Sequence, residues 1–227
     1  MKKSLLVFVI CLQTFLVIGQ TTVYDTIRYA REYYQERVSL FKSESTREGS
    51  VIFLGNSITE FGDWRKLLND STVINRGVAA DNTFGVLDRL EDVIVRKPGK
   101  LFIEIGINDI SQNIPESIIV RNILAIVAGV RSKLPQTKIY VHSILPTNDN
   151  VKNEYPDAYN KNPVAASVNR QLEQKAKEYK FVYIDLSRKL SDRNGKLDLK
   201  YADPDGLHLN EAGYLLWVRI LREGKYL

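Results

Sequence analysis

Short, continuously apolar runs alternate along the chain with longer segments whose apolar residues recur at helical spacing. The apolar runs are rich in β-branched residues and cover 50–55, 71–77, 100–106, 138–144 and 180–186. Helical spacing covers 83–95, 117–134, 163–179 and 212–221. Strands without polar alternation, separated by helices, predict a parallel sheet that is buried on both faces.

Right-handed crossovers between parallel strands narrow this pattern to one arrangement. We predict an α/β fold, a flavodoxin-like three-layer α/β/α sandwich with a five-stranded parallel sheet. No repeat or linker interrupts the pattern, so 20–227 is predicted to form a single domain. Helical spacing also predicts an amphipathic N-terminal helix over 23–42, before the first strand.

One segment departs from the alternation. Residues 146–163 read PTNDNVKNEYPDAYNKNP and follow the fourth predicted strand. In open α/β sheets the carboxyl ends of the strands form the edge where ligands bind. A loop of this length is either a functional lid or a disordered insertion. Its tyrosines favour a candidate lid loop, because they could stack on a sugar or cover a site.

Residues 1–19 predict a cleavable signal peptide. Two lysines precede the apolar run SLLVFVICLQTFLVIG, and Gly19 supplies a small residue before the expected cleavage site. The alternatives are a membrane anchor and a lipoprotein modified at Cys11. Gln13 and Thr14 interrupt the run, which falls short of the ~20 apolar residues that a spanning helix needs. We therefore predict a periplasmic or secreted protein without a stable membrane anchor.

Composition narrows the function classes further. The chain is 44% hydrophobic and 26% charged, with a net charge of +5. Its Lys and Arg residues are scattered rather than gathered in a stripe, so we predict no nucleic-acid partner. Cys11 would leave with the signal peptide, which excludes thiol chemistry in the mature chain. His142 and His208 are the two histidines, so we predict no metal and no cofactor and interpret mid-strand His142 as structural.

Small polar residues gather at the carboxyl ends of the predicted strands. Ser57 follows the first strand, Gly77 ends the second and Asn108 follows the third. Beyond the fifth strand, Asp205 stands three residues before His208. Because a parallel sheet brings these ends to one edge, we expect them to converge on a hydrolytic site.

Each of these residue types suits one task in ester hydrolysis. The Ser57 hydroxyl is the candidate nucleophile, since His208 can take its proton near neutral pH. Asp205 can hold the imidazole in one tautomer. The backbone N–H groups of Ser57 and Gly77 and the Asn108 amide are candidate oxyanion-hole donors. Taken alone, Ser57 is equally suited to cap a helix, and that alternative stays open.

Four blocks carry a resemblance that covers about residues 50–215. FLGNSIT, NRGVAADNTFGVLDRL, IEIGINDI and DPDGLHLNEAGY resemble, in order, the main blocks of the GDSL, or SGNH, esterase/lipase superfamily. The chain looks most similar to the platelet-activating-factor acetylhydrolase-like branch, which includes bacterial carbohydrate and sialate O-acetylesterases. Two departures are Asn56 in the namesake Gly-Asp-Ser-Leu and the Asp81-Asn82 pair, which we expect to alter substrate contacts.

The resemblance implies a secreted serine esterase that removes short acyl groups, most of all acetyl, through an acyl-enzyme. The expected substrate is a small-molecule or glycan acyl ester, such as acetylated sialic acid or polysaccharide. Two alternatives stay open. A lysophospholipase- or thioesterase-type GDSL lipase would act on longer acyl chains, and a catalytically lapsed protein would only bind carbohydrate.

Overall fold

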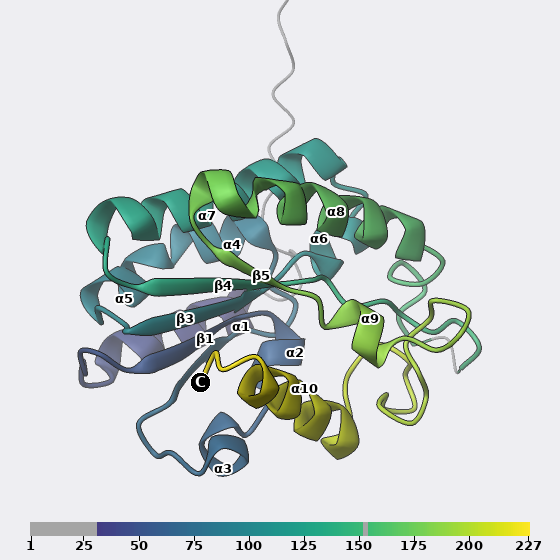
Figure 1. The fold of residues 1–227 in the computed structure, drawn as a ribbon, viewed down its shortest axis with the longest axis horizontal. Helices are drawn as coiled ribbons and strands as arrows, with labels where there is room; N and C mark the ends of the chain where they lie inside the picture. Colours follow the sequence, from purple (N-terminus) through teal and green to yellow (C-terminus); the bar gives the residue numbers. More distant parts are fainter. Residues whose placement is uncertain (1–30, 152–153) are drawn as a thin grey trace, which may run out of the picture.

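The computed structural model describes residues 31–151 and 154–227. Five parallel strands form one sheet in the order β2-β1-β3-β4-β5, which is the flavodoxin-like order (Figure 1). The strands are β1 (Val51–Gly55), β2 (Ile74–Gly77), β3 (Lys100–Glu104), β4 (Lys138–His142) and β5 (Val182–Ile184). The predicted fold class is confirmed.

Helices of very different length connect the strands. The longer ones are α1 (Arg31–Ser43), α7 (Glu116–Lys133), α8 (Asn162–Tyr179) and α10 (Glu211–Glu223). The shorter ones are α2 (Ser57–Glu60), α3 (Trp64–Leu68), α4 (Thr83–Asp88), α5 (Leu90–Val95), α6 (Ile107–Ser111) and α9 (Ser187–Leu190). Among the described residues, no helix is both long and apolar enough to cross a membrane.

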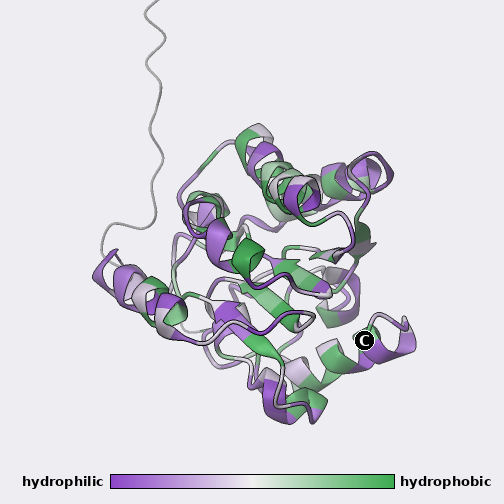
Figure 2. Ribbon diagram, turned by 90° about the vertical axis from the view of Figure 1, so that its left-hand side faces the viewer, coloured by the Kyte–Doolittle hydropathy of each residue, from purple (hydrophilic) through white to green (hydrophobic). Residues whose placement is uncertain are grey.

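The two faces of the sheet are packed with different side chains. Helices α4, α5, α7 and α8 cover one face, and α3 and α10 cover the other (Figure 1). On the α3/α10 face, Phe53 stacks on Trp64 at 3.9 Å and on Phe102 at 4.9 Å, and Trp217 meets Trp64 edge-on at 4.9 Å. Alternate strand residues are aliphatic and face α7 and α8. Figure 2 shows these apolar strands enclosed between helices of mixed hydropathy.

Two predicted elements differ from the observed ones for local reasons. β2 begins later than the predicted 71–77, because the Thr72 N–H donates to Asp70 Oδ1 at 2.8 Å and makes a turn there. The predicted helix over 83–95 is divided at Arg89, whose backbone leaves the helical region at φ −102° and ψ 11°. The Arg89 side chain is buried, and the break lets it reach the site described below.

Helix α1 realises the described part of the predicted helix over 23–42; its first residues, like the predicted signal peptide over 1–19, lie outside the described residues. α1 lies along the β2 edge of the sheet. Glu44, just after α1, pairs with Arg76 of β2 at 2.5 Å, and the Tyr34 hydroxyl donates to the Gly85 carbonyl at 2.8 Å. The N-terminal helix is therefore attached to the carboxyl-edge segments that follow β2.

Candidate active site

Ser57 lies where β1 turns into the short helix α2. Asn56 caps this helix, since its Oδ1 accepts a hydrogen bond from the Ile58 N–H at 2.9 Å. Ser57 is the first helical residue rather than the cap, and its hydroxyl is available for another contact. The capping alternative for Ser57 is wrong, because Asn56 performs that task.

The Ser57 hydroxyl forms one end of a hydrogen-bonded chain of three side chains. Ser57 Oγ lies 2.9 Å from His208 Nε2, and His208 Nδ1 lies 2.5 Å from Asp205 Oδ2. An ionised carboxylate only accepts hydrogen bonds, so Nδ1 carries the proton. The lone pair of Nε2 then faces the Ser57 hydroxyl, which is the arrangement that activates a serine.

The turn before His208 keeps the Asp205 carboxylate ionised. Asp205 Oδ1 accepts the backbone N–H groups of Leu207 and His208, each at 2.9 Å. Burial acts to raise the pKa of Asp205, but hydrogen bonds from the His208 ring and from these N–H groups outweigh it and hold the pKa below its usual value. Gly206 closes the turn at φ +66°, where a Cβ would lie 2.3 Å from the Asn148 carbonyl oxygen.

The imidazole of His208 lies between two aromatic side chains that reach solvent. The Phe61 ring centroid is 5.0 Å from that of His208, and the Tyr155 centroid is 5.6 Å away. Phe61 is 55% exposed and Tyr155 is 42% exposed, whereas Ser57 and His208 are only 8% and 7% exposed. Two exposed aromatic rings thus contact the buried His208 imidazole.

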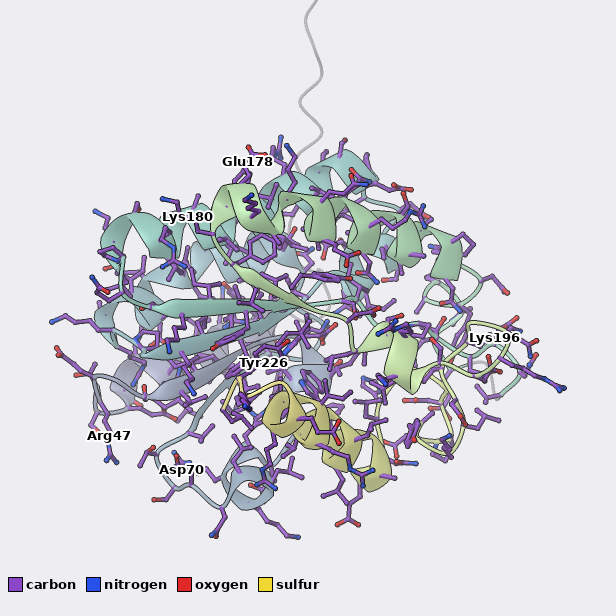
Figure 3. All side chains as sticks on the ribbon, viewed as in Figure 1. Arg47, Asp70, Glu178, Lys180, Lys196 and Tyr226 are labelled. Atoms are coloured by element: carbon purple, nitrogen blue, oxygen red, sulfur yellow. The ribbon has the colours of Figure 1, made fainter. Side chains whose placement is uncertain are left out.

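The described part of the predicted lid loop over 146–163 contacts the catalytic turn. The Tyr159 hydroxyl donates to the Asp205 carbonyl at 2.5 Å. Asp149 pairs with Lys196, which Figure 3 labels on the loop side of the molecule. The last two residues of the predicted loop belong to α8. The loop therefore lies at the site, while its movement as a lid stays a prediction.

Two of the predicted oxyanion donors have N–H groups to spare. The Ser57 backbone N–H donates to no group within 31–151 or 154–227. Asn108 lies in α6, directly after β3, which is the neighbour of β1 in the sheet. Its Nδ2 donates to the Asp81 carbonyl at 2.7 Å, and a primary amide has a second N–H.

The third predicted donor, Gly77, is a correction. Its N–H donates to Asn75 Oδ1 at 2.8 Å and is therefore not available to an oxyanion. The residue is glycine for another reason: a Cβ there would lie 2.2 Å from the backbone nitrogen of Glu60, so α2 could not approach β2. Gly77 of the second motif block therefore serves close packing. An oxyanion donor from this block has to be another residue.

The unpaired donor of this segment is the Ala80 N–H. The Asp81 N–H donates to the Val78 carbonyl at 3.1 Å, and Ala80 has a φ of +63°, which together define a type II turn over 78–81. The Ala79 N–H donates to Glu60 Oε2 at 2.5 Å. Within the described part of the chain, the Ala80 N–H has no hydrogen-bond acceptor. The turn lies between the Ser57 helix and Asn108, so this N–H can complete the oxyanion hole.

A buried ion pair fixes this turn from below. Arg89 Nε lies 2.8 Å from Asp81 Oδ2, and both side chains are at most 1% exposed. Arg89 also donates to the carbonyls of Arg76 and Gly55, both at 2.9 Å. Burial raises the pKa of Asp81 to about 6, although Arg89 opposes the shift. Asp81 and Asn82 are inaccessible, so the expectation that they alter substrate contacts is wrong.

A second buried carboxyl joins the segments after β2 and β3. Asp109 accepts hydrogen bonds from the Thr83 N–H and from the Thr83 hydroxyl, the latter at 2.5 Å. Asn122 of α7 donates to the same hydroxyl at 2.9 Å. Burial raises the pKa of Asp109 to about 7 against these hydrogen bonds. Helix α6, which carries Asn108, is thereby attached to the start of α4, directly after the turn that carries Ala80.

Sequence reasoning missed the roles of Ala80, Arg89 and Asp109. Arg89 had a usable signal, since it is a charged residue among the apolar positions of the predicted helix 83–95. Asp109 follows Asn108 directly, and its sequence context fits an exposed turn as well as it fits a buried hydrogen-bonded carboxyl. Ala80 had no signal, because left-handed positions normally carry glycine.

With the geometry established, comparison with known proteins becomes informative. A model of the GDSL-like lipase/acylhydrolase family matches residues 53–216, which is most of the chain. The chain belongs to the GDSL-like lipase/acylhydrolase family. The resemblance that the four motif blocks carry is confirmed.

Relatives of this GDSL acylhydrolase are distant in sequence and close in fold. Platelet-activating factor acetylhydrolase IB subunit alpha2 of Rattus norvegicus and of Homo sapiens is 30% identical over 109 residues, 45% of this chain. The chain spans 47% of the length of these curated relatives. A protein from Streptococcus pneumonia assigned as a platelet activating factor is 28% identical, with a TM-score of 0.74 over 86% of this chain and 91% of its own.

Two further structures support the fold of the GDSL acylhydrolase. A GDSL-like lipase from Bacteroides thetaiotaomicron is 23% identical, with a TM-score of 0.72 over 86% of this chain and 98% of its own. An acetylxylan esterase from Geobacillus stearothermophilus is 18% identical, with a TM-score of 0.61 over 79% of this chain and 95% of its own.

Within 31–151 and 154–227, no group of three or more His, Cys, Asp or Glu side chains is placed to hold a metal ion.

Proposed function

We propose that this acylhydrolase is a secreted serine esterase that removes acetyl and other short acyl groups from carbohydrate. Ser57 is the nucleophile, His208 the general base and acid, and Asp205 the residue that orients His208. The oxyanion hole consists of the Ser57 N–H, the Ala80 N–H and the Asn108 side-chain amide. The proposed reaction needs no metal or cofactor.

The reaction proceeds in two halves. Ser57 Oγ attacks the ester carbonyl carbon while its proton passes to His208 Nε2, and the carbonyl oxygen becomes an oxyanion. The tetrahedral intermediate collapses, the sugar alcohol takes the proton from His208, and an acyl-enzyme remains. Water then attacks this ester with His208 as the base, and the carboxylic acid leaves as Ser57 recovers its proton.

The single observation that carries the proposal is the hydrogen-bonded chain from Asp205 to Ser57, with its distances of 2.5 Å and 2.9 Å. A protein that only binds carbohydrate has no need of a carboxylate–imidazole–hydroxyl relay of this geometry. The relay therefore favours an active esterase over the catalytically lapsed alternative.

Support for a sugar ester comes from the two exposed aromatic rings beside His208. The exposed rings of Phe61 and Tyr155 flank His208, which must protonate the leaving alcohol. Aromatic rings can pack on the apolar face of a sugar while its hydroxyls stay in water. One structural relative is an acetylxylan esterase, and the curated relatives are acetylhydrolases, which also favours a short acyl group.

The exposure of Phe61 also favours one competing substrate. A 55% exposed phenylalanine at the site is an apolar surface that a longer acyl chain could cover. This observation keeps the lysophospholipase- or thioesterase-type lipase as the second candidate. Chain length of the preferred acyl group separates the two.

The deciding experiment measures kcat/KM on p-nitrophenyl esters from acetate to decanoate, followed by acetate release from acetylated xylan and acetylated sialic acid. We expect acetate esters to be preferred, because each methylene that a pocket rejects changes the rate by roughly 10-fold or more. Rates that rise steadily with chain length would transfer the assignment to the lipase. N-terminal sequencing of the exported protein tests the proposed cleavage after Gly19, and a chain that retains Met1 would contradict it.

A further inference from the structure

Glu60 lies on α2, one helical turn after Ser57, and its carboxylate contacts two other elements. Oε2 accepts the Ala79 N–H at 2.5 Å. Oε1 accepts the Tyr33 hydroxyl and lies 3.2 Å from Arg37 Nε. The Glu60 side chain is 10% exposed. One carboxylate thus joins the helix of the nucleophile, the type II turn over 78–81 and the N-terminal helix α1.

Helix α1 holds the turn from more than one side. Arg37 Nη2 donates to the Gly77 carbonyl at 3.4 Å, immediately before the turn. Tyr34 donates to the Gly85 carbonyl at 2.8 Å, after the turn. With Tyr33 on Glu60, three side chains from little more than one turn of α1 hold Glu60 and the two ends of the segment that carries Ala80.

The turn requires such support because of its sequence. Ala80 has a φ of +63°, a region in which a Cβ is crowded and which glycine adopts far more readily. A non-glycine residue holds such a conformation only when its surroundings impose it, and such residues cluster at functional sites. The Ala79 N–H···Glu60 bond holds the Val78–Ala79 peptide, one unit before the Ala79–Ala80 peptide that carries the Ala80 N–H, and so constrains the first half of the turn that directs that N–H.

We propose that Glu60 is a positioning residue of the oxyanion hole and that α1, through Tyr33 and Arg37, holds its carboxylate in place. The inference rests on the proposed esterase function and extends it. Glu60 does not touch the reacting atoms. It presets the Ala80 N–H for the oxyanion, so that α1 acts on turnover from the far side of the turn.

The test compares kcat and KM of Glu60→Ala, Glu60→Gln and Tyr33→Phe with the wild type on p-nitrophenyl acetate, well below the lowest melting temperature. An oxyanion forms only after substrate binds, so a misplaced donor lowers kcat and leaves KM nearly unchanged. We expect Glu60→Ala to lose roughly 10–100-fold in kcat, as small misplacements of catalytic groups do. Glu60→Gln should recover much of that loss, because its amide oxygen still accepts the Ala79 N–H.

Glu44→Gln is the matched control. Glu44 pairs with Arg76 and attaches the end of α1 to β2 without contacting the turn. This variant weakens the attachment of α1 while leaving Glu60 and Ala79 as they are. It should keep the wild-type kcat.

The outcomes separate this inference from the proposed function. If Ser57→Ala retains activity, the esterase assignment itself fails. If Ser57→Ala is inactive but Glu60→Ala melts earlier at unchanged kcat, Glu60 is merely structural and the inference is overturned. A kcat loss in Glu44→Gln as large as in Glu60→Ala overturns it equally. Should Glu60→Ala not fold, Tyr33→Phe decides, since loss of one hydroxyl should lower kcat about 2–5-fold, and an unchanged kcat overturns the inference.

Discussion

The two histidines of the chain lie in opposite surroundings. His208, at the carboxyl edge of the sheet, has one ring nitrogen on Asp205 and the other on Ser57. His142, at the end of β4, is 1% exposed; it stacks on Phe102 at a centroid distance of 5.7 Å and meets Trp217 edge-on at 5.0 Å. Neither of its nitrogens has a hydrogen-bond partner within the described residues.

Each histidine also has a carboxylate nearby, and the carboxylates differ in the same way. Three hydrogen bonds, from the His208 ring and from the backbone N–H groups of Leu207 and His208, keep the Asp205 carboxylate ionised. Ile103 and Val141 are paired across β3 and β4, so the next residues, Glu104 and His142, are neighbours on one face. Burial alone raises the pKa of Glu104 to about 8 and lowers that of His142 to about 3. Both groups are therefore neutral in the core at neutral pH.

A histidine and a neighbouring carboxyl group therefore do not suffice for a catalytic pair. Hydrogen bonds to the ionised Asp205 carboxylate polarise the Asp205–His208 pair at the sheet edge, and His208 Nε2 points at Ser57. Desolvation neutralises the core pair, which packs as large, nearly apolar side chains in the aromatic layer. Substitutions at the two sites test this contrast.

Exchange of each histidine for glutamine should separate the two sites most strongly. His208→Gln removes the base and should lower kcat by roughly 10⁴-fold or more, as loss of a triad member does elsewhere. His142→Gln should leave kcat unchanged. Stopped-flow or steady-state kinetics on both variants check this. A catalytic defect in His142→Gln of similar size would contradict the structural role of the core histidine.

Substitution of the two carboxyl groups should likewise lower kcat at the sheet edge and leave it unchanged in the core. Asp205→Asn leaves a hydrogen-bonding side chain but favours the wrong imidazole tautomer, so kcat should fall by roughly 10⁴-fold. Glu104→Gln should keep full activity. Both variants should fold, which circular dichroism can verify. Wild-type turnover by Asp205→Asn would remove Asp205 from the catalytic set.

Asn108 tests the electrostatic part of the edge site. Asn108→Ala removes one oxyanion donor and should lower kcat by roughly 10²–10³-fold with little change in KM. If Asn108 served only to hold Asp81, the variant would lose about 1 kcal/mol of stability and keep its kinetics. Kinetic constants and melting temperature, measured on the same preparation, distinguish the two.

The core pair should appear instead in the pH dependence of stability. Between its ordinary pKa of 4.5 and about 8, Glu104 is protonated when folded and ionised when unfolded. The free energy of unfolding should then fall by about 1.4 kcal/mol for each unit of rising pH. For His142, protonated only when unfolded between about 3 and 6.5, the loss should occur as pH falls through that range.

Urea unfolding of the wild type, Glu104→Gln and His142→Gln between about pH 3 and pH 8 measures both losses of stability. Asp81 and Asp109 also have raised pKa values, so the difference between variant and wild type isolates each group. Glu104→Gln should lose less stability than the wild type as pH rises from 4.5 to about 8. His142→Gln should lose less as pH falls from 6.5 to about 3. A steeper alkaline loss in Glu104→Gln than in the wild type would mean that Glu104 is charged and paired in the core.

Local pattern was enough to determine the elements and much of the site. Five apolar runs between helical segments determined the sheet, because strands of this kind can bury both faces only between helices. Ser57, Asn108 and the Asp205/His208 pair each follow a strand, and parallel strands end at one edge. The sequence therefore sufficed to predict that these residues share one edge of the sheet, and the structure joins Ser57, His208 and Asp205 there.

Only the tertiary structure decided which backbone groups remain available. Gly77 looked like a donor, yet its N–H is taken by Asn75, and the unpaired N–H belongs to Ala80. Glu60, Arg89 and Asp109 acquire their roles from partners 19, 34 and 26 residues away in the chain. Hydrophobic periodicity is a local property of the sequence. The allocation of hydrogen bonds among buried groups depends on long-range packing, which local patterns do not encode.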